Sequence, residues 1–157
     1  TQGASIMVDL SGNFTGYMTD MTRVFSVGEI GELAKKAHKC SQRINHELAE
    51  MGKPGTPAKA LFERALAIAT EEGLDLYFMG HRQHAGFVGH GVGIEVNELP
   101  VIAPRSKDIL EENNVIALEP KFVIPQVGAV GIENTYVVTP EGMKSITNAP
   151  EEIISLD

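Results

Sequence analysis

The stretch VDLSGNFTGYMTDMTR, residues 8–23, places two aspartates in two β-forming segments joined by glycine and asparagine. Residues 5–10 are rich in β-formers, and residues 14–26 continue in extended form, so we predict a β-hairpin with its turn at 11–13. Asp9 lies in the first arm and Asp20 in the second.

The next part of the chain has the spacing of amphipathic helices. Seven apolar residues of the segment 29–51 recur in steps of three and four: Ile30, Leu33, Ala37, Cys40, Ile44, Leu48 and Met51. They predict a helix with this buried stripe. A second helix is predicted to begin with Thr56 as N-cap and Pro57 in the first helical position. It runs to about Glu72, where Gly73 ends it.

The remaining residues predict irregular backbone and strands. Residues 79–93 are rich in Gly and His, which indicates a segment that allows close backbone approach. Strands are predicted at 94–97, 115–123 (interrupted by Pro120), 130–139 and 143–147. The order of hairpin, two helices and several strands predicts an α+β layered fold. We interpret residues 1–157 as a single domain.

Composition narrows the classes of function. The 157 residues suit one domain with its own hydrophobic core. The net charge of -8, from 21 acidic and 13 basic residues, argues against nucleic acid or an anionic membrane as partner. No apolar run approaches the ~18 residues of a membrane span, and the first residues form no signal peptide. Cys40 is the single cysteine; we expect it in the core, which fits a reducing, cytoplasmic setting.

Two more carboxylates lie in apolar strand sequence, Glu119 in IALEP and Glu133 in VGIEN. A buried carboxylate is costly unless it is paired or bound to metal, and several in one core repel one another. His90, between Gly89 and Gly91, adds an imidazole. Bound cations are the simplest resolution. The glycines equally mark a loop, so the residues alone leave a metal site and a structural role open.

Four stretches resemble, in order, the motifs of the pita-bread metallopeptidases, which include methionine aminopeptidase, aminopeptidase P and prolidase. They are VDLSGNFTGYMTDMTR (8–23), GHGVGIEVNELP (89–100), ALEPK (117–121) and GIENT (131–135). Their wording is closest to the aminopeptidase P and prolidase branch. The resemblance implies the pita-bread (creatinase/aminopeptidase) fold, a curved, mostly antiparallel sheet covered by helices. That fold has elements before the first Asp motif, so we expect a C-terminal catalytic portion with the N-terminal part missing.

The resemblance also implies a ligand set for two divalent metal ions, Mn, Co, Fe or Zn. The family's five ligands fall on Asp9, Asp20, His90, Glu119 and Glu133. Asp20 and Glu133 would bridge the ions, Asp9 would complete one site, and His90 with Glu119 the other. Glu119 would also move a proton from the attacking water to the leaving nitrogen.

Thr22 and Thr135 lie two residues from Asp20 and Glu133, so each shares the ligand face of its strand. We expect their hydroxyls to support the two carboxylates by hydrogen bonds. The alternative is that both are ordinary β-favouring threonines.

Other positions depart from the family pattern. Asn97 and Gly86 stand where the family usually has histidines, and Gly131 stands where prolidase-like members tend to have an arginine. Asn97 can still donate a hydrogen bond to an oxyanion. His84 or His81 could supply an imidazole if their loop folds inward; otherwise they are exposed loop residues. The metal ligands are therefore kept, while the usual substrate-binding donors are altered.

The resemblance implies a metal-dependent aminopeptidase or Xaa-Pro dipeptidase that hydrolyses a peptide bond near the N-terminus of its substrate. We expect a peptide as partner, no nucleic acid or membrane, and a homodimer at full length. Without N-terminal substrate-binding residues, the fragment itself is expected to be inactive. The alternative is a non-catalytic pita-bread binding module that has lost the substrate-binding histidines; such modules usually lose ligands too. A creatinase-like enzyme relies on His without metal, the reverse of this pattern.

Overall fold

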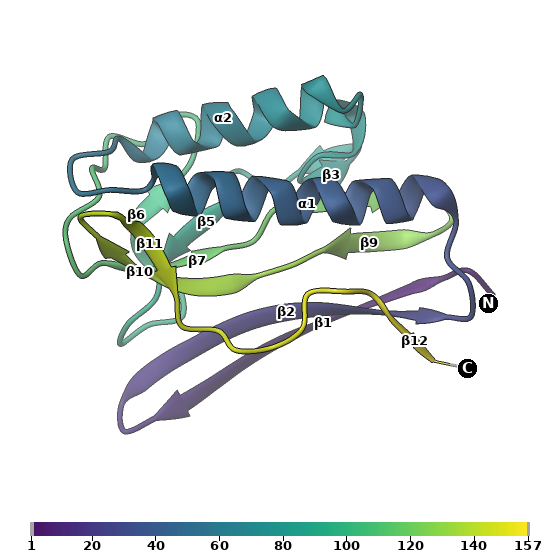
Figure 1. The fold of residues 1–157 in the computed structure, drawn as a ribbon, viewed down its shortest axis with the longest axis horizontal. Helices are drawn as coiled ribbons and strands as arrows, with labels where there is room; N and C mark the ends of the chain where they lie inside the picture. The colour runs from purple at the N-terminus through teal and green to yellow at the C-terminus, as the bar shows by residue number, and fades with distance from the viewer. Residues whose placement is uncertain (1, 157) are drawn as a thin grey trace.

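Two helices lie side by side over one face of the strands in the computed structural model, which describes residues 2–156 (Figure 1). Helix α1 spans Glu32–Met51, α2 spans Ala58–Glu71, and the short 3-10 helix η1 spans Asp75–Tyr77. The predicted order of hairpin, two helices and strands is confirmed, and with it the α+β class.

The strands form a five-stranded sheet and three smaller ones. The central sheet is antiparallel throughout, in the order β11 (Gly142–Ser145), β10 (Asn134–Thr139), β7 (Val115–Leu118), β5 (Gly89–Gly91) and β6 (Glu98–Ile102). The second sheet joins β1 (Ser5–Phe14), β2 (Tyr17–Val27) and β12 (Ile154–Leu156). The other two sheets have two strands each: β8 (Lys121–Ile124) pairs with β9 (Gly128–Gly131), and β3 (Gly80–His81) pairs with β4 (Gln83–His84).

The hairpin turn lies at Thr15 and Gly16, not at 11–13 as predicted. Phe14 pairs with Tyr17, and both turn residues have positive φ, 51° and 94°. Two-residue hairpin loops favour this left-handed backbone because it matches the twist of the strands. The residues at 11–13 stay in β1, so the hairpin is longer than the sequence indicated.

The buried stripe of α1 differs from the apolar pattern. The helix begins at Glu32, and Leu33 and Met51 are exposed. Ser41 and Asn45, both polar, are fully buried instead. Both side chains form hydrogen bonds with the backbone of the sheet layer, so burial of this helix face depends on hydrogen bonding as well as on apolar contact.

The start of α2 also differs from the prediction. Pro57 is the N-cap and Ala58 the first helical residue. The Thr56 hydroxyl donates to the Met51 carbonyl, in the preceding turn, instead of capping the helix. The predicted end is confirmed: Gly73 follows the helix with φ of 67°, a conformation that glycine adopts without strain.

The later strands match the prediction in part. The segment 94–97 is not a strand; β6 begins at Glu98. Pro120 separates β7 from β8 as predicted, and a further break at Ile132 and Glu133 separates β9 from β10. A strand that breaks at a carboxylate can point that side chain out of the regular alternation of the sheet.

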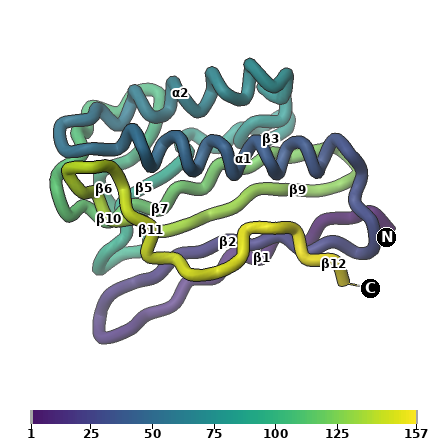
Figure 2. Tube along the Cα trace, in the orientation of Figure 1, coloured from purple at the N-terminus to yellow at the C-terminus, as the bar shows by residue number. Residues whose placement is uncertain are grey.

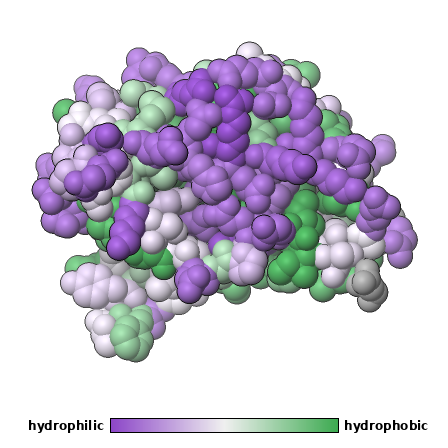
Figure 3. Space-filling model, viewed as in Figure 1, coloured by the Kyte–Doolittle hydropathy of each residue, from purple (hydrophilic) through white to green (hydrophobic). Residues whose placement is uncertain are grey.

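The hydrophobic core lies between the helices and the strands beneath them. Large, fully buried side chains from both layers fill it, among them Ile44, Leu48, Leu61, Ile68, Leu118 and Phe122. Cys40 is buried in this core as predicted, and burial raises the pKa of its thiol to about 12. On the outer face hydrophilic residues gather over the helices (Figure 3), where Arg43 and Arg64 share the carboxylates of Glu47 and Glu71.

The C-terminal segment returns under the helices. Figure 2 shows it leaving β11 and running alongside β2 to β12, with both ends of the chain at one side of the molecule. There β12 pairs in parallel with the end of β2. Neither helix in residues 2–156 combines the length and apolar character needed to cross a lipid bilayer.

Candidate metal centre

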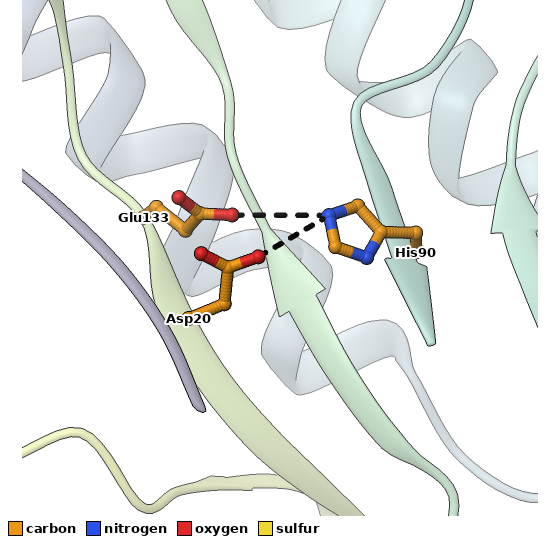
Figure 4. Close-up of side chains that lie close together, drawn as sticks. All are labelled: Asp20, His90 and Glu133. Carbon is orange, nitrogen blue, oxygen red and sulfur yellow. Dashed lines mark ion pairs between the residues drawn. The ribbon is translucent and has the colours of Figure 1, made fainter. Parts of the chain in front are cut away.

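Three side chains from three separate segments converge on one point. Asp20 comes from β2, His90 from β5 and Glu133 from the break between β9 and β10 (Figure 4). Nε2 of His90 lies 3.7 Å from Oδ2 of Asp20 and 4.0 Å from Oε1 of Glu133. One possible ligand atom from each residue lies within 4.8 Å of the others, and all three residues are buried. The arrangement can hold a metal ion.

The backbone around His90 sets the direction of its ring. Nδ1 donates to the Gly91 carbonyl at 3.0 Å, because a carbonyl can only accept. Nε2 is then left to face the carboxylates, as a metal-binding imidazole requires. A Cβ at Gly89 would lie 2.5 Å from the Ala117 carbonyl oxygen, and one at Gly91 would lie 2.4 Å from that of Leu99. The flanking glycines therefore serve close strand packing: the close backbone approach expected of residues 79–93 is present, but Gly89–Gly91 form strand β5 and not the irregular backbone that was predicted.

The carboxylates of this cluster resist ionisation in the metal-free protein. Burial and the nearby charge of Asp9 raise the pKa of Asp20 to about 6, against the attraction of His90. Burial raises the pKa of Glu133 to about 8, opposed by the Thr22 hydrogen bond and aided by the charges of Glu119 and Asp20. Such shifts mark a site where negative charge is concentrated without enough compensation.

Glu119 lies on the rim of the cluster. Its Oε1 is 3.5 Å from Nε2 of His90. Its Oε2 forms an ion pair with Lys121, two residues further along. Lys121 is the last residue of the stretch ALEPK and received no role from the sequence, although its charge beside a proposed ligand was the available signal.

Asp9 does not join the three converging residues. It is exposed on β1, where it pairs with Thr22 of β2. Residues that pair directly share a face of the hairpin, and Thr22 shares its face with Asp20. Asp9 is therefore on the side of the cluster, and its role as a ligand stays a prediction.

Thr22 supports a carboxylate of the cluster by a hydrogen bond, as expected, whereas Thr135 does not. The Thr22 hydroxyl donates to Oε2 of Glu133 at 2.6 Å. The Thr135 hydroxyl donates to the backbone carbonyl of Asp20 at 2.7 Å, not to its carboxylate. Each threonine thus connects one carboxylate-bearing segment to the other.

The residues predicted to help with substrate, Asn97 and His84, are exposed in the structure. Asn97 is exposed in the segment before β6. His84 is exposed in β4, and its Nδ1 donates to the Phe78 carbonyl. A Cβ at Gly131 would lie 2.5 Å from the Pro120 carbonyl oxygen, so the close approach of β8 excludes an arginine there without a backbone shift. The roles proposed for Asn97 and His84 stay predictions.

Two buried polar residues of helix α1 hold the backbone next to Glu119 and Glu133. The Ser41 hydroxyl donates to the Pro120 carbonyl at 2.6 Å and accepts from the Ile132 amide at 2.9 Å. Nδ2 of Asn45 donates to the Leu118 and Ile132 carbonyls. These contacts fix the residues next to Glu119 and Glu133. Neither Ser41 nor Asn45 was predicted to have a role; the available signal was their position on the buried face of the helix, four residues after Ala37 and three before Leu48.

The donor set fits a divalent cation. Buried carboxylate oxygens with one imidazole nitrogen form a mixed oxygen and nitrogen site that suits hard and borderline ions. A cation would also remove the repulsion that keeps the pKa values of Asp20 and Glu133 high.

Comparison with known proteins agrees with this geometry. Residues 1–140 match the sequence model of metallopeptidase family M24. The chain is 35% identical over 153 residues to an Xaa-Pro dipeptidase of Pyrococcus horikoshii, covering 98% of this chain and 42% of the relative. It therefore spans less than half the length of that relative.

Solved structures give the same result. The chain superposes on the X-Pro aminopeptidase of Thermotoga maritima with a TM-score of 0.89 at 28% identity, covering 99% of this chain and 42% of that one. It superposes on the prolidase of Pyrococcus horikoshii with a TM-score of 0.86 at 34% identity, covering 98% and 42%. The predicted pita-bread fold is confirmed, and the chain belongs to metallopeptidase family M24, whose members use divalent metal.

Proposed function

We propose that the protein containing this chain is a dinuclear metal-dependent peptidase that removes an N-terminal residue from a peptide, with Xaa-Pro substrates preferred. The convergence of Asp20, His90 and Glu133 carries the proposal. The named relatives, an Xaa-Pro dipeptidase and an X-Pro aminopeptidase, support the substrate class. In a binding module without metal, several carboxylates buried around one imidazole would repel one another without compensation.

Each residue has a role that follows from its position. Asp20 and Glu133 would serve both ions, Mn, Co, Fe or Zn, with Asp9 completing one site and His90 with Glu119 the other. Bound ions would supply Lewis acidity and lower the pKa of water. Glu119 would accept and return the proton at its carboxylate, since it lies on the more open rim. The Thr22 hydroxyl would keep the Glu133 carboxylate in orientation.

The test is elemental analysis of the full-length protein after incubation with Mn, Co or Zn, followed by assays on Xaa-Pro dipeptides and longer Xaa-Pro peptides. We expect about two ions per chain in the wild type. Asp20→Asn should lose metal and turnover together, while Asp75→Asn, at an exposed position in η1, should keep both. Normal metal content and turnover in Asp20→Asn would refute the assignment. Wild-type protein without metal or turnover would favour the binding module.

A further inference from the structure

The guanidinium of Arg23 is buried under the candidate site, with the residue only 6% exposed. Within residues 2–156 it donates five hydrogen bonds to three segments of the chain. Nη1 donates to the Thr22 and Glu133 carbonyls at 2.8 Å each. Nη2 donates to Oδ1 of Asn134 at 2.8 Å and to the Ala149 carbonyl at 3.0 Å, and Nε donates to the Pro150 carbonyl at 2.6 Å.

These acceptors distinguish Arg23 from an arginine held in an ordinary ion pair. All five are amide oxygens, so the charge is stabilised by dipoles and not by a bonded carboxylate. A planar guanidinium presents its donors in fixed directions, and its acceptors must therefore keep fixed positions relative to one another. A lysine ammonium is a compact point charge that lacks this rigid fork.

The segment 149–151 is itself held in place on its other side. The Glu151 carboxylate accepts from Nδ2 of Asn134 at 2.7 Å and from Nε2 of His46 at 2.9 Å. The Glu151 carbonyl accepts from Nε2 of His38 at 2.6 Å and from Gln42 at 3.1 Å. Helix α1 thus anchors the segment whose carbonyls anchor Arg23.

The same guanidinium reaches the backbone of the metal cluster. Thr22 and Glu133 exchange two long backbone hydrogen bonds, of 3.3 and 3.2 Å, in an isolated bridge between β2 and the break before β10. Their carbonyls also accept from one nitrogen of Arg23. This bridge sets the separation between the strand of Asp20 and the residue Glu133.

We propose that Arg23, locked by the segment 149–151, is a positioning residue that holds the Thr22–Glu133 bridge at the separation where the Asp20 and Glu133 carboxylates converge on His90. Its consequence for metal affinity rests on the proposed function, whereas its effect on the bridge does not.

The experiment compares wild type, Arg23→Lys, Glu151→Ala and Arg64→Lys in the full-length protein. Arg64 instead forms ordinary ion pairs with Glu47 and Glu71 on the helices, so its substitution controls for the change from arginine to lysine itself. Circular dichroism establishes that each variant is folded. Amide hydrogen exchange is measured on metal-free protein at residues 20–24 and 131–135, and Mn²⁺ and Co²⁺ dissociation constants are measured by titration.

We expect Arg23→Lys to accelerate exchange at the Thr22 and Glu133 amides while α2 stays unchanged. Metal affinity should fall about 10- to 100-fold, the usual effect of removing a group that orients a ligand. Glu151→Ala should show the same two changes to a smaller extent, and Arg64→Lys should show neither. Folded Arg23→Lys protein with wild-type exchange at both amides would overturn the proposal.

Two other outcomes are also decisive. If Arg23→Lys does not fold, Glu151→Ala decides, because it leaves Arg23 and its acceptors in place; wild-type exchange and metal affinity in that variant would refute the lock. If the wild type binds no metal, the metal centre of the proposed function fails, while amide exchange still decides whether Arg23 positions the bridge.

Discussion

The hydroxyl of Thr22 donates a 2.6 Å hydrogen bond to Oε2 of Glu133, a residue 111 positions away. The two residues also pair through their backbones. The bond favours the ionised carboxylate and so opposes the rise in pKa that burial imposes on Glu133. One threonine thus joins the first and last acidic motifs and prepares Glu133 to bind a cation.

Thr22→Val removes this hydroxyl at nearly constant volume. We expect about a tenfold loss of metal affinity or more, because the Glu133 carboxylate loses both its orientation and its donor. Thr19→Val is the control, since Thr19 lies on the same strand but is exposed, and within residues 2–156 its hydroxyl donates only to the Gly12 carbonyl. Equal metal titrations for both variants would contradict the role of Thr22.

Ser41→Ala leaves the buried Ile132 amide and the Pro120 carbonyl without their shared partner. We expect a loss of about 2 kcal/mol in the free energy of unfolding, because a buried unsatisfied donor costs about 1–3 kcal/mol. Urea unfolding measures it. Ser145→Ala, at an exposed position in β11, should change stability by less than about 0.5 kcal/mol. A Ser41→Ala protein as stable as this control would show that water replaces the hydroxyl.

Lys121→Met tests the ion pair on the rim of the site. Lys121 occupies one oxygen of Glu119 and adds positive charge where a cation is expected to bind. Its removal should raise affinity for divalent metal by about tenfold, since like charges repel at short range. Lys59→Met removes an exposed lysine paired with Glu63 and should have no effect. Weaker metal binding in Lys121→Met would show that the lysine supports Glu119 as a ligand.

The raised pKa values predict how pH affects the metal-free protein. The pKa of Glu133 rises from 4.5 to about 8 on folding, and that of Asp20 from 3.8 to about 6. The folded state therefore holds these protons after the unfolded chain has released them. This contribution to stability is complete below about pH 4 and is lost as pH rises through about 8.

Urea unfolding of metal-free protein at ~pH 5.5 and ~pH 8.5 measures this loss. Glu133→Gln cannot ionise and should show a clearly smaller decrease over the same interval. Saturating metal should restore stability at the higher pH, because it binds the ionised folded state. A wild-type protein that gains stability over this interval, or the same decrease in Glu133→Gln, would be inconsistent with the assigned pKa shifts.

The sequence predicted the hairpin but placed its turn wrongly. Ser11, Gly12 and Asn13 have typical turn composition, yet they continue β1 because Thr15 and Gly16 adopt the positive φ angles of the two-residue loop. Register then follows: Asp9 pairs with Thr22 and Ser11 with Asp20. Which residues pair across a hairpin depends on the loop that forms, and local propensity does not distinguish two adjacent candidates.

The helical stripe shows a similar limit. Apolar spacing predicted α1 and its burial of Ile44 and Leu48, but it also assigned Leu33 and Met51 to a face that leaves them exposed. It passed over Ser41 and Asn45, because polar residues are buried only where specific partners satisfy them. Those partners are strand carbonyls and an amide more than 70 residues away.

By itself the sequence determined the order of the elements and the fold class, because spacing and residue type are local properties, and its resemblance to the pita-bread motifs supplied the acidic and histidine residues proposed as ligands. Only the tertiary structure decided that Asp20, His90 and Glu133 converge while Asp9 stays exposed on its strand. It alone showed that Arg23, Ser41 and Lys121 act on the ligand-bearing segments. The physical reason is that such contacts join residues distant in the chain, and their geometry is set when the strands and α1 pack together.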